Sequence, residues 1–272
     1  GVNNDDPSVT GPSTKLILDA IQEFTVLKNN FNAEFGSTAG GQFNTITMSG
    51  TNTLHGSLFS YLQNEGFNSD YSNGTRPYFR DHRFGGTIGL PVIKDKLFFF
   101  SAYQYDRVNQ SAVTSSYLAP TQAGLQQIAT LGGASKYVVS ALQEHLTLAP
   151  TATTTRTVLG TPDVPFGLVS LTVPASSREH LMQTNIDHTP NDKNQFRYRF
   201  SFERRHAEQP GGGSAAFNNL QTYDSRLFSA TWVRVFSPTV VNDARLAYRR
   251  IGENYPLKNP SLSAVPNIVV TD

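Results

Sequence analysis

The sequence lacks cysteine altogether, and its 272 residues include few charges and no long apolar run. Without cysteine, disulfide frameworks, thiolate metal sites and cysteine nucleophiles are excluded. The longest unbroken apolar run is the four residues Leu97 to Phe100, far below the ~20 residues that a transmembrane helix needs. Charged residues make up only 16% of the chain, and 22 Lys and Arg against 21 Asp and Glu leave a net charge of +1. Because a nucleic-acid-binding protein needs a large basic excess to neutralise phosphates, we expect no nucleic-acid partner.

Aromatic residues, by contrast, are plentiful. The chain has 18 Phe, 11 Tyr and 1 Trp, yet its mean hydropathy is only −0.33. A transmembrane β-barrel combines both properties, because its strands alternate lipid-facing and lumen-facing residues and its aromatic residues gather at the two membrane interfaces. A soluble β-sandwich has a similar composition, so composition alone leaves both classes open.

Period-2 runs between turn signals predict seven strands, which cover roughly 54–63, 81–92, 97–107, 178–189, 195–206, 225–236 and 241–251. Three of the connections are tight turns, at 93–96, 190–194 and 237–240. The other three are long, at 64–80, 108–177 and 207–224. Since short and long connections alternate, an up-and-down antiparallel sheet places every tight turn at one end. Outer-membrane barrels sort their loops in this way, whereas a soluble sandwich has no reason to do so.

The strand at 195–206 has two chemically different faces. We expect four aromatic residues to be lipid-facing: Phe196, Tyr198, Phe200 and Phe202. The residues between them, and their equivalents on 241–251, are expected to face the lumen: Arg197, Arg199, Glu203, Arg245 and Arg249. In a soluble protein the aromatic face would be core instead. The run 97–103 does not alternate, which predicts burial on both faces, with its lumen side against something inside the barrel.

The first 53 residues have a different pattern and predict a small mixed α/β unit. Residues 16–27 are expected to form a short helix or turn followed by a strand, 31–35 one helical turn, and 42–48 a second strand. Helical spacing also occurs within the longest connection, across 121–148, where it is interrupted at Gly132-Gly133.

Several short motifs follow one another in a specific order along 15–107 and 178–251. They are Ile21-Gln22-Glu23-Phe24, Phe31-Asn32-Ala33-Glu34-Phe35-Gly36, Gly40-Gly41-Gln42-Phe43-Asn44, Ser49-Gly50-Thr51-Asn52, His55-Gly56-Ser57, Phe84-Gly85-Gly86-Thr87-Ile88-Gly89-Leu90-Pro91, Lys96-Leu97-Phe98-Phe99-Phe100 and Phe236-Ser237-Pro238 with Val241-Asn242 and Arg245. This series resembles the end of the plug domain and the barrel strands of TonB-dependent outer-membrane receptors, most nearly their Oar-like branch. One departure is Leu90, where the family usually has a second Gly.

The resemblance implies a mostly β fold: a partial, up-and-down, transmembrane antiparallel β-barrel preceded by the end of a small α/β plug domain. Residues 1–53 would be the C-terminal part of the plug. Residues 54–272 would be the N-terminal part of the barrel, with 108–177 as a long extracellular loop. The implied function is energy-coupled uptake of a bulky substrate across the outer membrane, with outer-membrane lipid and a TonB-type coupling protein as partners. We expect the coupling segment to lie outside this chain, which resembles a piece of a receptor.

Two other functions stay open at this point: an outer-membrane barrel that acts in adhesion or signalling without uptake, and a soluble β-sandwich binding module. Nothing in the sequence predicts an enzyme. Gly212-Gly213-Ser214 lacks the context of a nucleophile elbow, and Asp187-His188-Thr189-Pro190-Asn191-Asp192 lacks the spacing of a calcium loop. We therefore expect no catalytic residue, no metal ligand and no cofactor, and the sequence does not identify the substrate.

Overall fold

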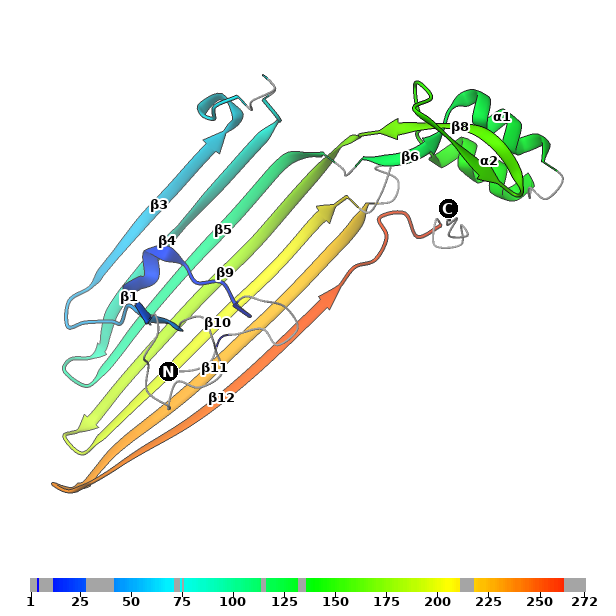
Figure 1. The fold of residues 1–272 in the computed structure, drawn as a ribbon. Coiled ribbons are helices and arrows are strands. Elements are labelled where there is room, and N and C mark those ends of the chain that lie inside the picture. Colours follow the sequence, from blue (N-terminus) through cyan, green and yellow to red (C-terminus); the bar gives the residue numbers. More distant parts are fainter. Residues whose placement is uncertain are drawn as a thin grey trace.

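A computed structural model describes residues 4, 12–27, 42–70, 74, 76–113, 116–131, 136–210 and 218–261. Its main feature is a seven-stranded antiparallel sheet in the order β12-β11-β10-β9-β5-β4-β3 (Figure 1). The strands are β3 (His55–Asn64), β4 (Phe79–Ile93), β5 (Leu97–Val113), β9 (Thr172–Asn191), β10 (Asn194–Gln209), β11 (Asn219–Ser237) and β12 (Val240–Asn254). All seven predicted strands are confirmed. The soluble sandwich is the wrong architecture, because these strands lie side by side in one sheet rather than in two packed sheets.

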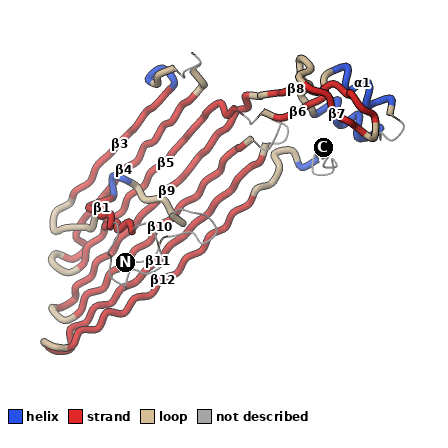
Figure 2. Tube along the Cα trace, viewed as in Figure 1, coloured by secondary structure: helices blue, strands red, loops and turns tan. Residues whose placement is uncertain are grey.

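Tight turns and long connections lie at opposite ends of this sheet, as the alternation predicts (Figure 2). In the turn between β4 and β5, Asp95 has a φ of 64°, a left-handed conformation that Asp tolerates better than most residues. The strands are longer than expected at the other end. β5 continues from the predicted residue 107 to Val113, and β9 begins at Thr172 instead of 178. Their pairing extends to Val113 opposite Thr172, through a stretch in which polar residues such as Asn109, Gln110 and Ser176 are mixed with small apolar ones.

A separate module occupies the long connection between β5 and β9 and lies beyond the end of the sheet (Figure 1). We call residues 116–171 the inserted module. It consists of β6 (Tyr117–Pro120), α1 (Gln122–Thr130), α2 (Lys136–His145), β7 (Thr154–Val158) and β8 (Thr161–Val169), with its strands in the order β6-β8-β7. The helical pattern at 121–148 is confirmed as two helices. The three strands were not predicted, because Thr, Pro and Gly obscure their alternation.

The described N-terminal residues lie over one face of the large sheet (Figure 1). They include a 3-10 turn, η1 (Leu18–Ala20), and two paired antiparallel strands, β1 (Ile21–Leu27) and β2 (Gln42–Thr47). The predicted elements at 16–27 and 42–48 are thus confirmed, whereas the helical turn expected at 31–35 lies outside the described residues. A further 3-10 turn, η3 (Glu65–Phe67), follows β3. We call the sheet surface beneath the N-terminal residues the covered face, and the opposite surface the open face.

The strand β5 shows how different the two faces are. On the covered face, Phe100 and Ala102 are each 1% exposed, whereas Tyr103 on the open face is 43% exposed. Burial on the covered side confirms the prediction for 97–103, but the expected burial on both sides is wrong, since no second layer lies against the open face in the part of the chain that the structure describes. Within the same ranges, no helix is long and apolar enough to span a bilayer.

Candidate functional site at the covered face

Ser13 and Thr14 are tied directly to β11 on the covered face. The Tyr223 hydroxyl donates a hydrogen bond to the Ser13 carbonyl oxygen (2.7 Å), and the hydroxyls of Thr14 and Ser225 are 2.8 Å apart. Ser13, Thr14 and Ser225 are completely buried. These bonds pair polar groups that would otherwise be desolvated without a partner, so the segment is bound to the sheet at a defined position.

Lys15 brings a positive charge to two buried carboxylates of the sheet. Its ammonium Nζ lies 2.7 and 2.9 Å from the two carboxylate oxygens of Glu179 on β9, and its backbone N–H donates to Glu203 Oε2 on β10 at 2.8 Å. Glu179 and Glu203 are only 4% and 2% exposed. Buried charges without partners are strongly destabilising. The N-terminal segment therefore supplies both a cation and an N–H donor that this part of the sheet requires.

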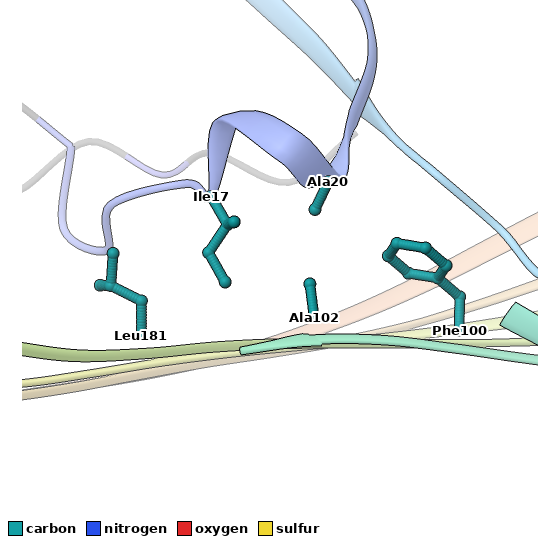
Figure 3. Close-up of a cluster of buried hydrophobic side chains, with 5 residues drawn as sticks. All are labelled: Ile17, Ala20, Phe100, Ala102 and Leu181. Carbon is teal, nitrogen blue, oxygen red and sulfur yellow. The ribbon is translucent and has the colours of Figure 1, made fainter. Parts of the chain in front are cut away.

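Beside this polar contact is a small apolar cluster (Figure 3). Ile17 and Ala20 from the N-terminal segment point toward the sheet, and Phe100, Ala102 and Leu181 point toward them from β5 and β9. Every member is at most 2% exposed. The segment is thus held on the sheet by this apolar cluster together with the hydrogen bonds of Ser13, Thr14 and Lys15.

The last residue of β2 and the residues that follow it are held by a second group of polar side chains. Asn185 on β9 donates to the Thr47 hydroxyl at 2.8 Å and to the Met48 carbonyl oxygen. Arg199 on β10 forms an ion pair with Asp187 at 2.7 Å and reaches the Ser49 hydroxyl at 3.5 Å.

Gly50 comes even closer to the sheet. A Cβ atom at this position would clash with the carbonyl oxygens of Phe99 and Leu90. Only glycine allows the backbone to pass here, which explains why a Ser-Gly pair precedes β3.

The cross-strand register places all five charged residues of the sequence-based prediction on the covered face: Arg197, Arg199, Glu203, Arg245 and Arg249. Of these, Arg199 and Glu203 contact the N-terminal residues. Arg197 donates to Gln195, and Arg245 pairs with Asp243. The structure thus places these residues on one face, and their exposure to a lumen stays a prediction.

The four predicted aromatic residues lie together on the open face: Phe196, Tyr198, Phe200 and Phe202. Phe196 stacks on Trp232 of β11, with ring centroids 6.1 Å apart and an interplanar angle of 2°, and on His188 of β9 at 6.0 Å. Tyr198 is opposite Ala230, and Phe200 opposite Phe228. Tyr198 is exposed and the three Phe rings are half-buried against their neighbours. Aromatic rings gathered on one face of an extended sheet are typical of a lipid-facing surface, which stays a prediction for this chain.

Sequence reasoning missed Lys15, Glu179, Tyr223 and Asn185 as contact residues. A signal was present on β9, where the polar residues Glu179, Gln183 and Asn185 share one face of the strand and only Leu181 on that face interrupts them. That pattern indicates a polar buried face on a strand. The pattern does not identify the residue that contacts this face.

Next to Lys15 the covered face is hollowed toward the long-connection end. Charged side chains surround this hollow: Lys15, Arg83, Asp106, Glu179 and Arg205. Such a lining suits a polar ligand that exchanges hydrogen bonds with charged groups. Within the described residues, no group of three or more His, Asp or Glu side chains is arranged to hold a metal ion.

Comparison with known proteins decides the family. A family model described as an outer membrane beta barrel domain matches residues 46–269. The chain belongs to this family. An outer membrane beta barrel domain is inserted in the bacterial outer membrane, and this is where the protein is located.

A curated relative adds a more specific likeness. The chain is 29% identical over 117 residues to the TonB-dependent transporter Oar of Myxococcus xanthus. The match covers 38% of this chain and 11% of the relative, so the chain spans only a small part of that protein. No solved structure matches the chain.

Proposed function

We propose that this outer membrane beta barrel domain belongs to a TonB-dependent transporter that takes up a bulky substrate with energy supplied through a TonB-type coupling protein. In this proposal residues 1–53 are the end of the plug, 54–272 are the first part of the barrel wall, and the inserted module is extracellular. The covered face is the lumen side, and the open face contacts membrane lipid. The protein is a transporter and not an enzyme, and it needs no cofactor.

The observation that carries the proposal is the chemistry of the contact between the N-terminal segment and the sheet. Lys15, Thr14 and Ser13 are held by hydrogen bonds and an ion pair, and one apolar cluster of five residues supplements them. When such a contact opens to water, each polar group exchanges its partner for water, so the net loss per hydrogen bond is only ~1 kcal/mol. A segment bound in this way has a defined resting position and can still be displaced by a pulling force.

A disulfide between segment and wall tests this directly. Thr14 and Ser225 have hydroxyl oxygens 2.8 Å apart, and the printed chain has no other cysteine to interfere. In the full-length protein, the pair Thr14→Cys and Ser225→Cys is oxidised, and accumulation of labelled peptides, glycans and metal chelates is measured in cells. We expect accumulation of at least one compound to depend on the protein and on the proton gradient, to stop in the oxidised variant and to return on reduction.

The matched control is a disulfide within the wall. Ser101 on β5 and Thr184 on β9 have hydroxyl oxygens 3.2 Å apart on the open face, with no contribution from the N-terminal segment. The pair Ser101→Cys and Thr184→Cys should leave accumulation unchanged. The proposal would be contradicted if uptake continued in the oxidised Thr14–Ser225 variant, or if uptake were independent of the proton gradient.

Adhesion or signalling without uptake is the second candidate, and the inserted module favours it. This module has two apolar clusters of its own, which include Ile128, Val139, Val164 and Phe166 in one and Ala119, Ala149 and Val169 in the other. A surface activity would survive the Thr14–Ser225 disulfide and disappear when residues 116–171 are removed. Energy-coupled uptake would instead stop when the Thr14–Ser225 disulfide forms.

A further inference from the structure

Basic side chains face one another across three neighbouring strands at the long-connection end of the open face. Arg107 on β5 lies directly opposite Arg178 on β9. Arg178 is in turn opposite His206 on β10, and Arg107 is opposite His82 on β4. All four side chains are exposed. We call His82, Arg107, Arg178 and His206 the basic row.

Like charges directly opposite each other destabilise a sheet, so such a row needs an explanation. The acidic residues next to it in sequence, Asp106 and Glu179, face the other way, because side chains alternate along a strand. Asp224 on the open face already pairs with Arg204 and Arg226. Within the described ranges neither Arg107 nor Arg178 has an acidic partner.

The position of the row along the strands matches the edge of a membrane. Arg107 lies ten residues beyond Leu97, the first residue of β5 at the tight-turn end. At ~3.4 Å per residue and a tilt of ~40°, these residues span roughly 26 Å along the membrane normal. The apolar band of a transmembrane barrel is ~25 Å tall. The guanidinium groups therefore reach the level where lipid headgroups begin.

The residues just before the row support this placement. Tyr103 donates or accepts a hydrogen bond with His180 Nδ1 at 2.8 Å, and the ring of Tyr105 lies 4.9 Å from that of His180. Tyrosine rings with a polar end are enriched at the membrane interface. On the adjacent strands, Arg204 and Arg226 lie over the ring of Phe202 at 5.4 and 6.0 Å, an arrangement in which a charged group extends outward past apolar surface.

We propose that the basic row binds the phosphate groups of lipid headgroups in the outer leaflet, the phosphorylated glycolipid of the lipid A type. Neighbouring strands are ~4.8 Å apart, so the guanidinium groups of Arg107 and Arg178 are close enough to hold one phosphate between them. Arginine donates two parallel hydrogen bonds to a phosphate, which suits it to this role. The inference rests on the assignment of the open face to lipid and of the long connections to the cell exterior, and it is independent of uptake.

The test compares lipid binding by full-length variants purified in nonionic detergent. The variant R107Q/R178Q is titrated with bis-phosphorylated lipid A and with dephosphorylated lipid A. A basic residue near a charged membrane surface contributes roughly fivefold to binding, so we expect about 30-fold weaker binding of the phosphorylated lipid for the pair. R107K/R178K should retain most of the affinity, and millimolar inorganic phosphate should not displace the lipid.

A matched control is R234Q. Arg234 is on the open face of β11 near the tight turn, where its guanidinium lies 4.7 Å from the Phe236 ring centroid. It should bind phosphorylated lipid A like the wild type, and all variants should migrate as folded barrels in unboiled gels. Equal affinity of R107Q/R178Q and wild type, or an equal loss for dephosphorylated lipid, would overturn the proposal. An error in the face assignment is detected separately, by the labelling experiment on Arg197 and Tyr198 described below.

Discussion

Replacing Ile17 should loosen the N-terminal segment from the sheet without altering the sheet itself. Ile17 is 0% exposed and contacts Phe100, Ala102 and Leu181 in the apolar cluster. Truncation of a buried Ile to Ala destabilises by ~2–5 kcal/mol, and truncation to Val by ~0.5–1.5 kcal/mol. The strands beneath are fixed by their backbone pairing, and two of the four other side chains in the cluster, Ala20 and Ala102, are too short to fill the space. The destabilisation caused by Ile17→Ala should therefore be well above the lower end of this range, ~2 kcal/mol.

Local opening can be measured by thiol labelling. Ser13 is completely buried, and its bond to Tyr223 uses the backbone carbonyl, so a Ser13→Cys reporter retains this contact. The cysteine reacts with a maleimide only when the segment lifts from the sheet, and the labelling rate is then proportional to the opening equilibrium. We expect at least ~30-fold faster labelling with Ile17→Ala and ~2- to 10-fold faster labelling with Ile17→Val.

The matched control is the same truncation, Ile to Ala, at a buried position in the inserted module. Ile128 belongs to the apolar cluster of the inserted module and does not contact the N-terminal segment. Ile128→Ala should leave the labelling of Ser13→Cys unchanged. If Ile17→Ala labelled no faster than the parent protein, or if Ile128→Ala accelerated labelling equally, the segment would not open as an independent unit and the reasoning would be refuted.

Three further predictions concern the sheet as a membrane wall. In the intact protein, Tyr198→Cys should react with a bilayer-soluble maleimide and Arg197→Cys with a water-soluble one; the reverse pattern would invert the two faces. Replacing residues 114–171, which are the inserted module and the two residues before it, with a two-residue Asn-Gly turn should leave a folded, heat-modifiable barrel, because β5 and β9 remain paired up to Val113 and Thr172; loss of the folded band would show that the module is required for folding. The chain 1–272 expressed alone should aggregate instead of inserting, because the edges at β3 and β12 would leave backbone groups unpaired in lipid at several kcal/mol each; a soluble monomer with a cooperative thermal transition would contradict this.

The strands and their faces were predictable because the signals for them are local. Side chains alternate every two residues, so Phe196 and Arg197 lie on opposite faces wherever the strand is placed. Turn residues such as Asp95 determine where one strand ends and the next begins. From these signals the order of tight turns and long connections follows, and with it the sorting of the connections to the two ends of the sheet.

The strands of the inserted module were not predictable in the same way. Thr154–Val158 contains only one apolar residue, and Thr161–Val169 is interrupted by Pro165 and Gly167. These strands owe their stability to packing against the helices, where Val164 and Phe166 meet Ile128 and Val139. Tertiary contact therefore decided an arrangement for which local propensity gave no indication.

The contact between segment and sheet depended most on tertiary structure. The sequence by itself determined that Glu179 and Glu203 lie on the same face of neighbouring strands, because period and register decide this. It did not determine that Lys15, 164 residues before Glu179, would supply their positive charge. Only the folded chain brings these groups together, because burial makes an unpaired carboxylate unstable and so selects the one arrangement in which the segment covers it.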